Sequence, residues 1–167
     1  YLPAEELREL ARRLEVPLHR IHEVASCFPH YRLKPPPAVD VAIFPSFPLL
    51  PAVAAALAGS TVGLGGQDLH PEDAGAHTGD VAGAQLSDAG CQWVLVGHSE
   101  RRHDHGEDDA LVARKLAAAG RNGLRPILCL GETGEERRAG RTFEVLARQL
   151  EAAVAAAPAD WVIAYEP

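Results

Sequence analysis

Four short apolar runs of this 167-residue chain are followed at once by polar side chains that can act as acid, base or hydrogen-bond partner. These polar positions are 67–68, 98–100, 132–133 and 166, and they include the imidazole of His98 and the carboxyl group of Glu166. In parallel sheets, ligands bind at the carboxyl ends of the strands. We therefore expect several strand ends to present acid–base and hydrogen-bonding groups to one common face.

The elements that position these groups alternate between strand and helix. The apolar runs are continuous, which is typical of strands buried on both faces of a parallel sheet; they are 39–44, 61–66, 93–97, 126–131 and 161–165. Helical patterns lie between them, at 49–57, 82–89, 108–119 and 142–157, the last with apolar Val145, Leu146, Leu150 and Val154. This alternation predicts an α/β fold.

The first 37 residues lack the alternation of apolar runs and helical patterns that the rest of the chain shows. Apolar residues at 7, 10, 11 and 14 predict a short amphipathic helix, and a second short helix follows Pro17. Three prolines at 35–37 favour a stiff extended connector. We therefore divide the chain into a helical N-terminal segment, 1–37, and an α/β part, 38–167.

Composition excludes several kinds of partner. The formal charge of -7 disfavours non-specific nucleic-acid binding, which needs a basic face. No apolar run approaches the length that spans a bilayer, and the N-terminus lacks the pattern of a signal peptide. We expect a cytoplasmic protein without a nucleic-acid or membrane partner.

Cysteines and histidines do not indicate a metal or a cofactor. The three cysteines, Cys27, Cys91 and Cys129, are widely spaced and form no CxxC pair, so we expect neither disulfides nor a zinc site. The loop histidines share no metal-ligand spacing: His70, His77, His103 and His105. We read these histidines as surface residues.

Five motifs, in order along the chain, resemble the triosephosphate isomerase family. The most specific is Val-Gly-His-Ser-Glu-Arg-Arg at 96–102. The others lie at 44–47 (FPSF), 66–68 with 75–80 (GQD and GAHTGD), 127–133 (ILCLGET) and 164–167 (AYEP). The resemblance covers residues 38–167. It implies a (β/α)8 barrel that is incomplete here, with about five parallel βα units.

This resemblance implies an aldose–ketose isomerase that interconverts dihydroxyacetone phosphate and glyceraldehyde 3-phosphate, a step of glycolysis and gluconeogenesis. Glu166 matches the family's base, which removes a carbon-bound proton and returns it to the next carbon. His98 matches the electrophile, a neutral imidazole that donates a hydrogen bond to the developing enediolate oxygen; the family is the established example of such an imidazole. The implied substrate is a small phosphorylated triose, with no cofactor.

Other matched positions imply supporting roles. Ser99 and Glu100 follow His98 as a helix start, and Glu100 matches a carboxylate that normally pairs with a catalytic lysine. Cys129 matches a cysteine packed near the base. Thr78 matches the tip of a loop that enters the partner subunit's active site in the family's homodimer.

Arg101 and Glu107 match a structural ion pair of the family. A carboxylate beside such a site can serve either catalysis or an ion-pair network. Both interpretations stay open for Glu100 and for Glu107.

The sequence also departs from the family pattern. The family's Asn-x-Lys motif, whose lysine binds the substrate phosphate, has no match, since the only asparagine is Asn122 and the only lysines are Lys34 and Lys115. The matched stretch ends at Pro167, where the family's mobile lid begins. We therefore expect the 167 residues alone to be inactive or nearly so. The alternative is a fused or truncated fragment with a structural or binding role.

The leading segment has a second, short resemblance. Residues 1–3, 14–17, 23–26 and 28–31 are similar to the N-terminal helices of the 24-kDa subunit of NADH:quinone oxidoreductase. That family's iron–sulfur cysteine cluster is missing, so no cofactor is implied. A divergent first barrel helix explains the same residues equally well.

Overall fold

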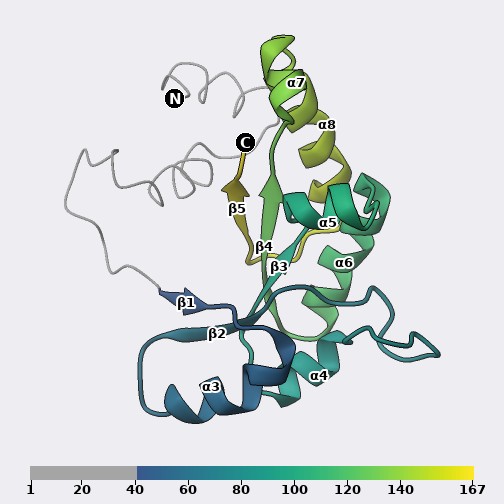
Figure 1. Cartoon of the computed structure of the whole chain (residues 1–167). Coiled ribbons are helices and arrows are strands. Elements are labelled where there is room, and N and C mark those ends of the chain that lie inside the picture. The colour runs from purple at the N-terminus through teal and green to yellow at the C-terminus, as the bar shows by residue number, and fades with distance from the viewer. Residues whose placement is uncertain (1–40) are drawn as a thin grey trace.

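The computed structural model describes residues 41–167 as one five-stranded parallel sheet with helices between the strands (Figure 1). The strands are β1 (Ala42–Ile43), β2 (Gly63–Gly66), β3 (Trp93–Val96), β4 (Arg125–Leu130) and β5 (Val162–Tyr165). The helices are η1 (Phe47–Leu49), α3 (Leu50–Ala56), α4 (Gly83–Asp88), α5 (Ser99–Asp104), α6 (Asp109–Arg121), α7 (Gly134–Arg138) and α8 (Thr142–Val154). The fold is the predicted α/β fold.

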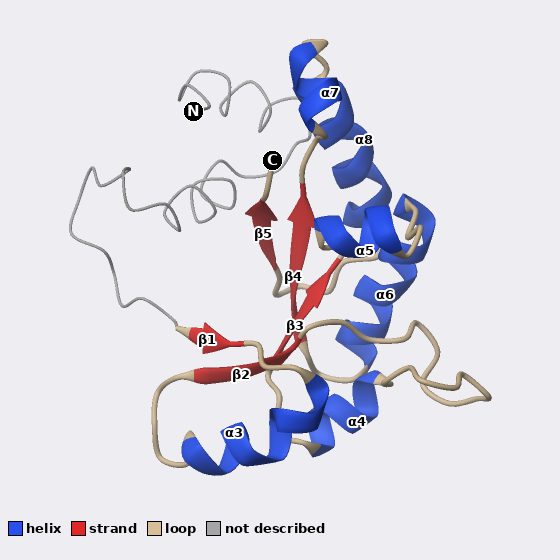
Figure 2. Ribbon diagram, in the orientation of Figure 1, coloured by secondary structure: helices blue, strands red, loops and turns tan. Residues whose placement is uncertain are grey.

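The strands lie in the sheet in their sequence order, and each pairs in parallel with the next. Their direction turns markedly from β1 and β2 to β4 and β5, as the twist of a parallel sheet requires (Figure 2). Helices α4 to α8 gather on one side of this curved sheet. Five parallel strands, the first four each followed by helix in the described residues, form a half-barrel, which confirms the expectation of an incomplete barrel.

The core lies between the strands and these helices. Val94 and Val96 of β3 and Leu128 of β4 are fully buried, and Leu116 of α6 and Leu86 of α4 pack in the same cluster. The α8 stripe differs from its prediction at one position. Ala153 is buried and Val154 is 42% exposed, because the helix turns Ala153 toward the core together with Leu150.

Local sequence signals start the helices next to the site. Asp108 Oδ1 accepts a hydrogen bond from Leu111 N at 2.7 Å and caps α6. Thr133 and Glu136 form a reciprocal capping box that starts α7. These caps direct the chain away from the strand ends, which leaves the carboxyl edge of the sheet to the site residues.

Some expectations for the N-terminal part lie outside the described residues. They are the two short helices, the proline connector, the boundary at residue 37 and the position of Lys34. Of the predicted run 39–44, the structure describes only Ala42–Ile43 as a strand. Val41 and Ile43 are 52% and 44% exposed at this end of the sheet.

Candidate active site

His98 and Glu166 meet at the carboxyl edge of the sheet. His98 follows β3 and Glu166 follows β5, and β4 lies between these two strands. His98 Nε2 lies 3.1 Å from Glu166 Oε1, and the two side chains are 28% and 41% exposed. The structure therefore brings the predicted imidazole and carboxylate next to each other, and both side chains are partly exposed.

The hydrogen bonds of His98 define its tautomer. Its Nδ1 accepts from Glu100 N at 3.4 Å, which makes His98 the N-cap of α5. A ring nitrogen that accepts carries no hydrogen, so the hydrogen of the neutral ring belongs on Nε2. His98 Nε2 then carries the hydrogen and lies 3.1 Å from Glu166 Oε1, and a ring N–H in this position can polarise a carbonyl oxygen.

Arg102 holds the strand end from which His98 projects. Its Nε donates to Gly97 O at 2.8 Å, its Nη1 to Asp109 Oδ1 at 2.7 Å and its Nη2 to Cys129 O at 3.5 Å. Gly97 has a φ of +72°, a conformation that L side chains rarely adopt. One guanidinium therefore joins the ends of β3 and β4 to the start of α6.

The backbone of Glu166 is held by the end of β4. Glu166 N donates to Leu130 O at 2.7 Å. A Cβ on Gly131 would lie only 1.8 Å from Glu166 O, so only glycine fits at this close approach. Among the described residues, Glu166 Oε2 is buried and has no hydrogen-bond partner. That oxygen is therefore an acceptor that no described side chain or backbone group occupies.

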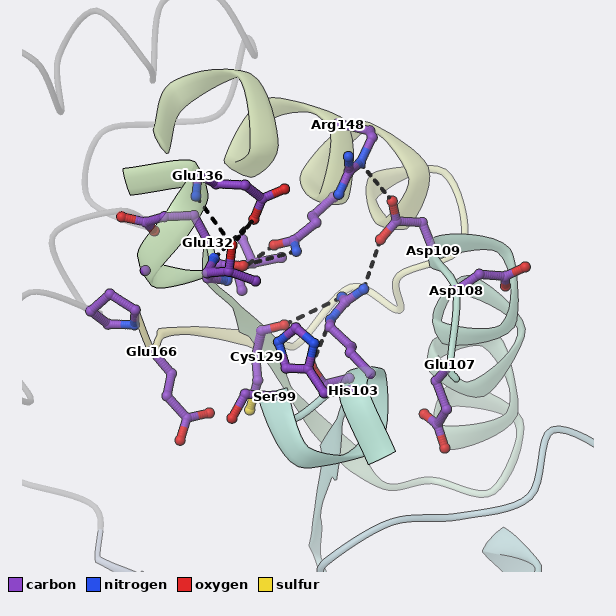
Figure 3. A pocket seen from close by; sticks show the side chains of 18 residues that line it. Ser99, His103, Glu107, Asp108, Asp109, Cys129, Glu132, Glu136, Arg148 and Glu166 are labelled. Carbon is purple, nitrogen blue, oxygen red and sulfur yellow. Dashed lines mark hydrogen bonds and ion pairs between the residues drawn. The ribbon is translucent and has the colours of Figure 1, made fainter. Parts of the chain in front are cut away.

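Cys129 lies buried near Glu166 (Figure 3). Burial and the negative charge of Glu166 raise the pKa of the Cys129 thiol to about 12. Figure 3 shows Cys129 beside Glu166 and Ser99. The thiol is therefore a packing group, and Ser99 starts α5 next to it.

A buried carboxylate ties β5 to the loop after β4. The side chain of Glu132 is fully buried and accepts from Tyr165 Oη at 3.1 Å and from Thr142 Oγ1 at 2.9 Å. Arg137 Nε lies 3.1 Å from Glu132 Oε1. Because Tyr165 precedes Glu166, this network also limits the movement of the base.

A second network contains the predicted Arg101–Glu107 ion pair. Arg101 Nε donates to Glu107 Oε1, and both carboxylates near it, Asp68 and Glu107, accept from the buried Lys115 Nζ at 2.6 to 2.7 Å. Burial alone would raise the pKa of Glu107, but hydrogen bonds from Lys115 and Arg101 lower it overall. For Asp68, burial outweighs Lys115 and the pKa is raised. Two cations and two carboxylates balance one another here.

The two carboxylates left open by the sequence differ sharply. Glu107 is 5% exposed inside this network, which favours its structural interpretation. The Glu100 side chain is 79% exposed, with Oε2 at 3.7 Å from His98 Nδ1. Lys115, in α6, is bound to Asp68 and Glu107, so its charge is engaged away from the imidazole.

Thr78 lies on an exposed loop between β2 and α4 that projects from the body of the fold (Figure 1). The predicted surface histidines of this loop are not independent. His70 and His77 stack with ring centroids 3.7 Å apart, and His70 Nε2 lies 3.6 Å from Asp80 Oδ2. These contacts hold together the two ends of the loop segment 70–80.

A hollow of about 630 Å³ opens beside the base. Ser99 and Glu166 line it, and the ion pair between Arg148 and Asp109 forms another part of its wall (Figure 3). His98 does not line it, so the hollow lies to one side of the His98–Glu166 contact. Within residues 41–167 no cluster of ligands suits a metal ion, and no helix is long and apolar enough to cross a bilayer.

The sequence placed Glu132 at a strand end, but two supporting residues were missed: Arg102 and Gln149. Arg102 belongs to the 96–102 motif, but nothing local showed that it binds two strand ends. Gln149 gave a usable signal, because it is a polar residue on the apolar stripe of α8. Such a residue is buried only when its amide is hydrogen-bonded.

Parallel βα units with an imidazole and a carboxylate meeting at their strand ends define an α/β-barrel enzyme. The family model described as "Triosephosphate isomerase" matches residues 19–167. This match begins within the leading segment, and no comparison shows the resemblance to the NADH:quinone oxidoreductase subunit.

Individual relatives agree with the family match. Triosephosphate isomerase of Afipia carboxidovorans is 53% identical over 131 residues, 77% of this chain and 52% of that protein. The enzyme of Nitratidesulfovibrio vulgaris is 52% identical over 134 residues, 77% of this chain and 53% of that protein. The crystal structure of triosephosphate isomerase from Bartonella henselae superposes with a TM-score of 0.72 at 41% identity, covering 77% of this chain and 55% of that one.

The chain belongs to the triosephosphate isomerase family, a family of isomerases. It spans about half the length of the curated relatives that it matches.

Proposed function

We propose that the protein to which this chain belongs interconverts dihydroxyacetone phosphate and glyceraldehyde 3-phosphate. The observation that carries the proposal is the 3.1 Å contact between His98 Nε2 and Glu166 Oε1 at the carboxyl edge of the sheet. Proton transfer between adjacent carbons needs a base and a hydrogen-bond donor on the same small substrate. These two groups, on strands separated only by β4, can meet both needs.

In the proposed reaction, Glu166 takes a proton from the carbon beside the carbonyl group. His98 Nε2–H donates to the carbonyl oxygen and stabilises the negative charge that develops there. Glu166 then returns the proton to the neighbouring carbon. The hydroxyl proton of the first carbon passes to the former carbonyl oxygen by way of His98 Nε2, so the carbonyl group moves to the first carbon and no proton is gained or lost. The substrate takes the place of the direct His98–Glu166 contact, and Ser99, Glu100 and Cys129 support the pair.

The remaining assignments follow from the same proposal. The substrate is a small phosphorylated triose, and the reaction needs no cofactor. The 71–80 loop with Thr78 at its exposed tip is our candidate contact in a homodimer. We propose a cytoplasmic enzyme without nucleic-acid or membrane partners.

We further propose that the 167 residues alone isomerise at or near the background rate. They contain no Asn-x-Lys sequence, and Lys115 Nζ is bound to Asp68 and Glu107. Without a cation on the phosphate, much of the binding free energy that orients the substrate is lost. The alternative, a fragment with a structural or binding role, predicts the same result for the isolated chain.

A chimera separates these two possibilities. Residues 38–167 replace the matching stretch of the Afipia carboxidovorans enzyme, and isomerisation is measured in a coupled assay. We expect turnover within about tenfold of the parent enzyme, because roughly half of the aligned residues are identical. His98→Gln and Glu166→Gln in the chimera should each remove most of it. A folded chimera without turnover would contradict the proposed function.

A further inference from the structure

We propose that Gln149 of α8 is a positioning residue for the base Glu166, acting through Gly131. The proposal rests on the proposed function, because it assigns Gln149 a task in that reaction. Gln149 does not touch the reacting groups. It binds the backbone of Gly131, which contacts the backbone of Glu166.

The Gln149 amide binds both sides of one residue. Its Oε1 accepts from Gly131 N at 3.0 Å, and its Nε2 donates to Gly131 O at 3.0 Å. Gln149 is 5% exposed, so these bonds form away from competing water. Two hydrogen bonds to one residue restrain both its position and its orientation.

Gly131 in turn lies against the backbone of Glu166. A Cβ at Gly131 would meet Glu166 O at 1.8 Å, Glu166 C at 2.6 Å and Pro167 N at 3.3 Å. The preceding residue, Leu130, accepts from Glu166 N at 2.7 Å. Any movement of Gly131 toward β5 therefore displaces the backbone of Glu166, because no free space separates them.

A buried glutamine among apolar residues of α8 loses hydrogen bonds to water, which lowers the free energy of unfolding unless protein groups replace them. Val145, Leu146, Leu150 and Ala153 make the rest of the buried stripe of α8 apolar. A leucine at 149 would suit that stripe and would be favoured by burial alone. Only the amide can both accept from Gly131 N and donate to Gly131 O. Positioning of the strand end explains the choice of residue, where packing does not.

The chain offers a matched control in Gln92. Its Oε1 accepts from Leu64 N at 3.1 Å and its Nε2 donates to Gly90 O at 2.8 Å, so it also binds backbone at two points. Gln92 precedes β3, at the opposite end of that strand from His98. Gln92→Leu therefore removes the same number of backbone hydrogen bonds as Gln149→Leu without touching the site.

The first test uses NMR on the full chain, observing the His98 Nε2–H signal and the Glu166 side-chain carboxyl carbon. In Gln149→Leu we expect the Nε2–H proton to exchange with water at least about tenfold faster and the carboxyl signal to shift, because the His98–Glu166 contact is loosened. Gln92→Leu should leave both signals unchanged. Gln149→Met also removes both hydrogen bonds but keeps the length and the unbranched shape of the side chain, and it provides a second variant should Gln149→Leu not fold.

The second test measures kcat and KM in the chimera described above. Misplacing a reacting group by about 1 Å costs on the order of 10²-fold, so we expect Gln149→Leu to lower kcat by roughly 10- to 100-fold with KM little changed. Gln92→Leu should retain the parent kcat. An active chimera in which Gln149→Leu keeps its kcat, with unchanged His98 and Glu166 signals, would overturn the positioning role. A folded chimera without turnover would instead count against the proposed function.

Discussion

His98 Nε2 and Glu166 Oε1 lie 3.1 Å apart although their residues are 68 positions apart in the sequence and follow different strands. The strand between them, β4, supplies no atom to this contact. β4 and the residue after it hold the two side chains in place. Leu130 and Gly131 contact the backbone of Glu166, and Cys129 O accepts a hydrogen bond from Arg102. The proposed reacting groups are thus held by a shared backbone.

Shortening the side chain of Glu166 tests whether the position of its carboxylate matters for the proposed reaction. Glu166→Asp withdraws the carboxylate by one methylene group and leaves its charge in place. Misplacement of about 1 Å should lower kcat in the chimera by on the order of 10²-fold, with a smaller change in KM. Steady-state kinetics in both directions measure this. Retention of the parent kcat would show that the position of this carboxylate does not limit the reaction.

Arg102 and Arg148 bind opposite oxygens of Asp109 and form a matched pair. The Arg102 side chain is 11% exposed and that of Arg148 is 58% exposed. Arg102→Ala should lower the free energy of unfolding by about 3 kcal/mol, because it leaves two backbone carbonyls without this donor and leaves Asp109 paired with the exposed Arg148 alone. Arg148→Ala should lower it by about 0.5 kcal/mol. Urea denaturation measures both, and equal losses would contradict this ranking.

Glu107 should make stability depend on pH in the acid range. Its pKa is lowered in the folded chain, by hydrogen bonds from Lys115 and Arg101, so the unfolded chain binds the proton more tightly. Its contribution to the free energy of unfolding is therefore fully present above the ordinary carboxyl pKa of 4.5 and is lost as the pH falls through the folded value. Glu107→Gln should reduce stability at neutral pH and flatten the loss between about pH 5 and pH 3.

Asp68 provides the comparison for that experiment. Burial raises its pKa, so its contribution has the opposite sign: it is present at low pH and is lost as the pH rises through the folded value. Asp68→Asn should therefore make the loss of stability in acid steeper. Unfolding by urea at several pH values distinguishes the two variants, and identical slopes would contradict the assignment.

The Cys129 thiol should react slowly with a thiol reagent. Its pKa of about 12 leaves a thiolate fraction near pH 8 that is roughly a thousandfold below that of an ordinary cysteine. In a Cys27→Ser, Cys91→Ser background, Glu166→Gln should speed the reaction, because the neighbouring negative charge is removed while burial remains. The exposed Glu100 is the control, and Glu100→Gln should leave the rate unchanged. Equal rates in all three chains would place Glu166 away from the thiol.

Local sequence was sufficient for most of the fold. The continuous apolar runs ending before His98 and Glu166 identified buried parallel strands, because such strands exclude polar residues on both faces. The Asp108 cap and the Thr133–Glu136 capping box are likewise local, since each satisfies backbone groups within three residues. The sequence did not decide which of the adjacent apolar residues Ala153 and Val154 is buried, because two neighbouring apolar residues can compete for one buried position.

The sequence by itself determined the order of βα units and the two strand ends that carry His98 and Glu166. Only the tertiary structure decided which distant groups pair around them: Lys115 with Asp68, 47 residues away, and Gln149 with Gly131, 18 residues away. Hydrophobic periodicity records whether a position is buried, since burial depends on the local face of a helix or strand. It does not record the hydrogen-bond partner, because that depends on how α6 and α8 pack against the sheet.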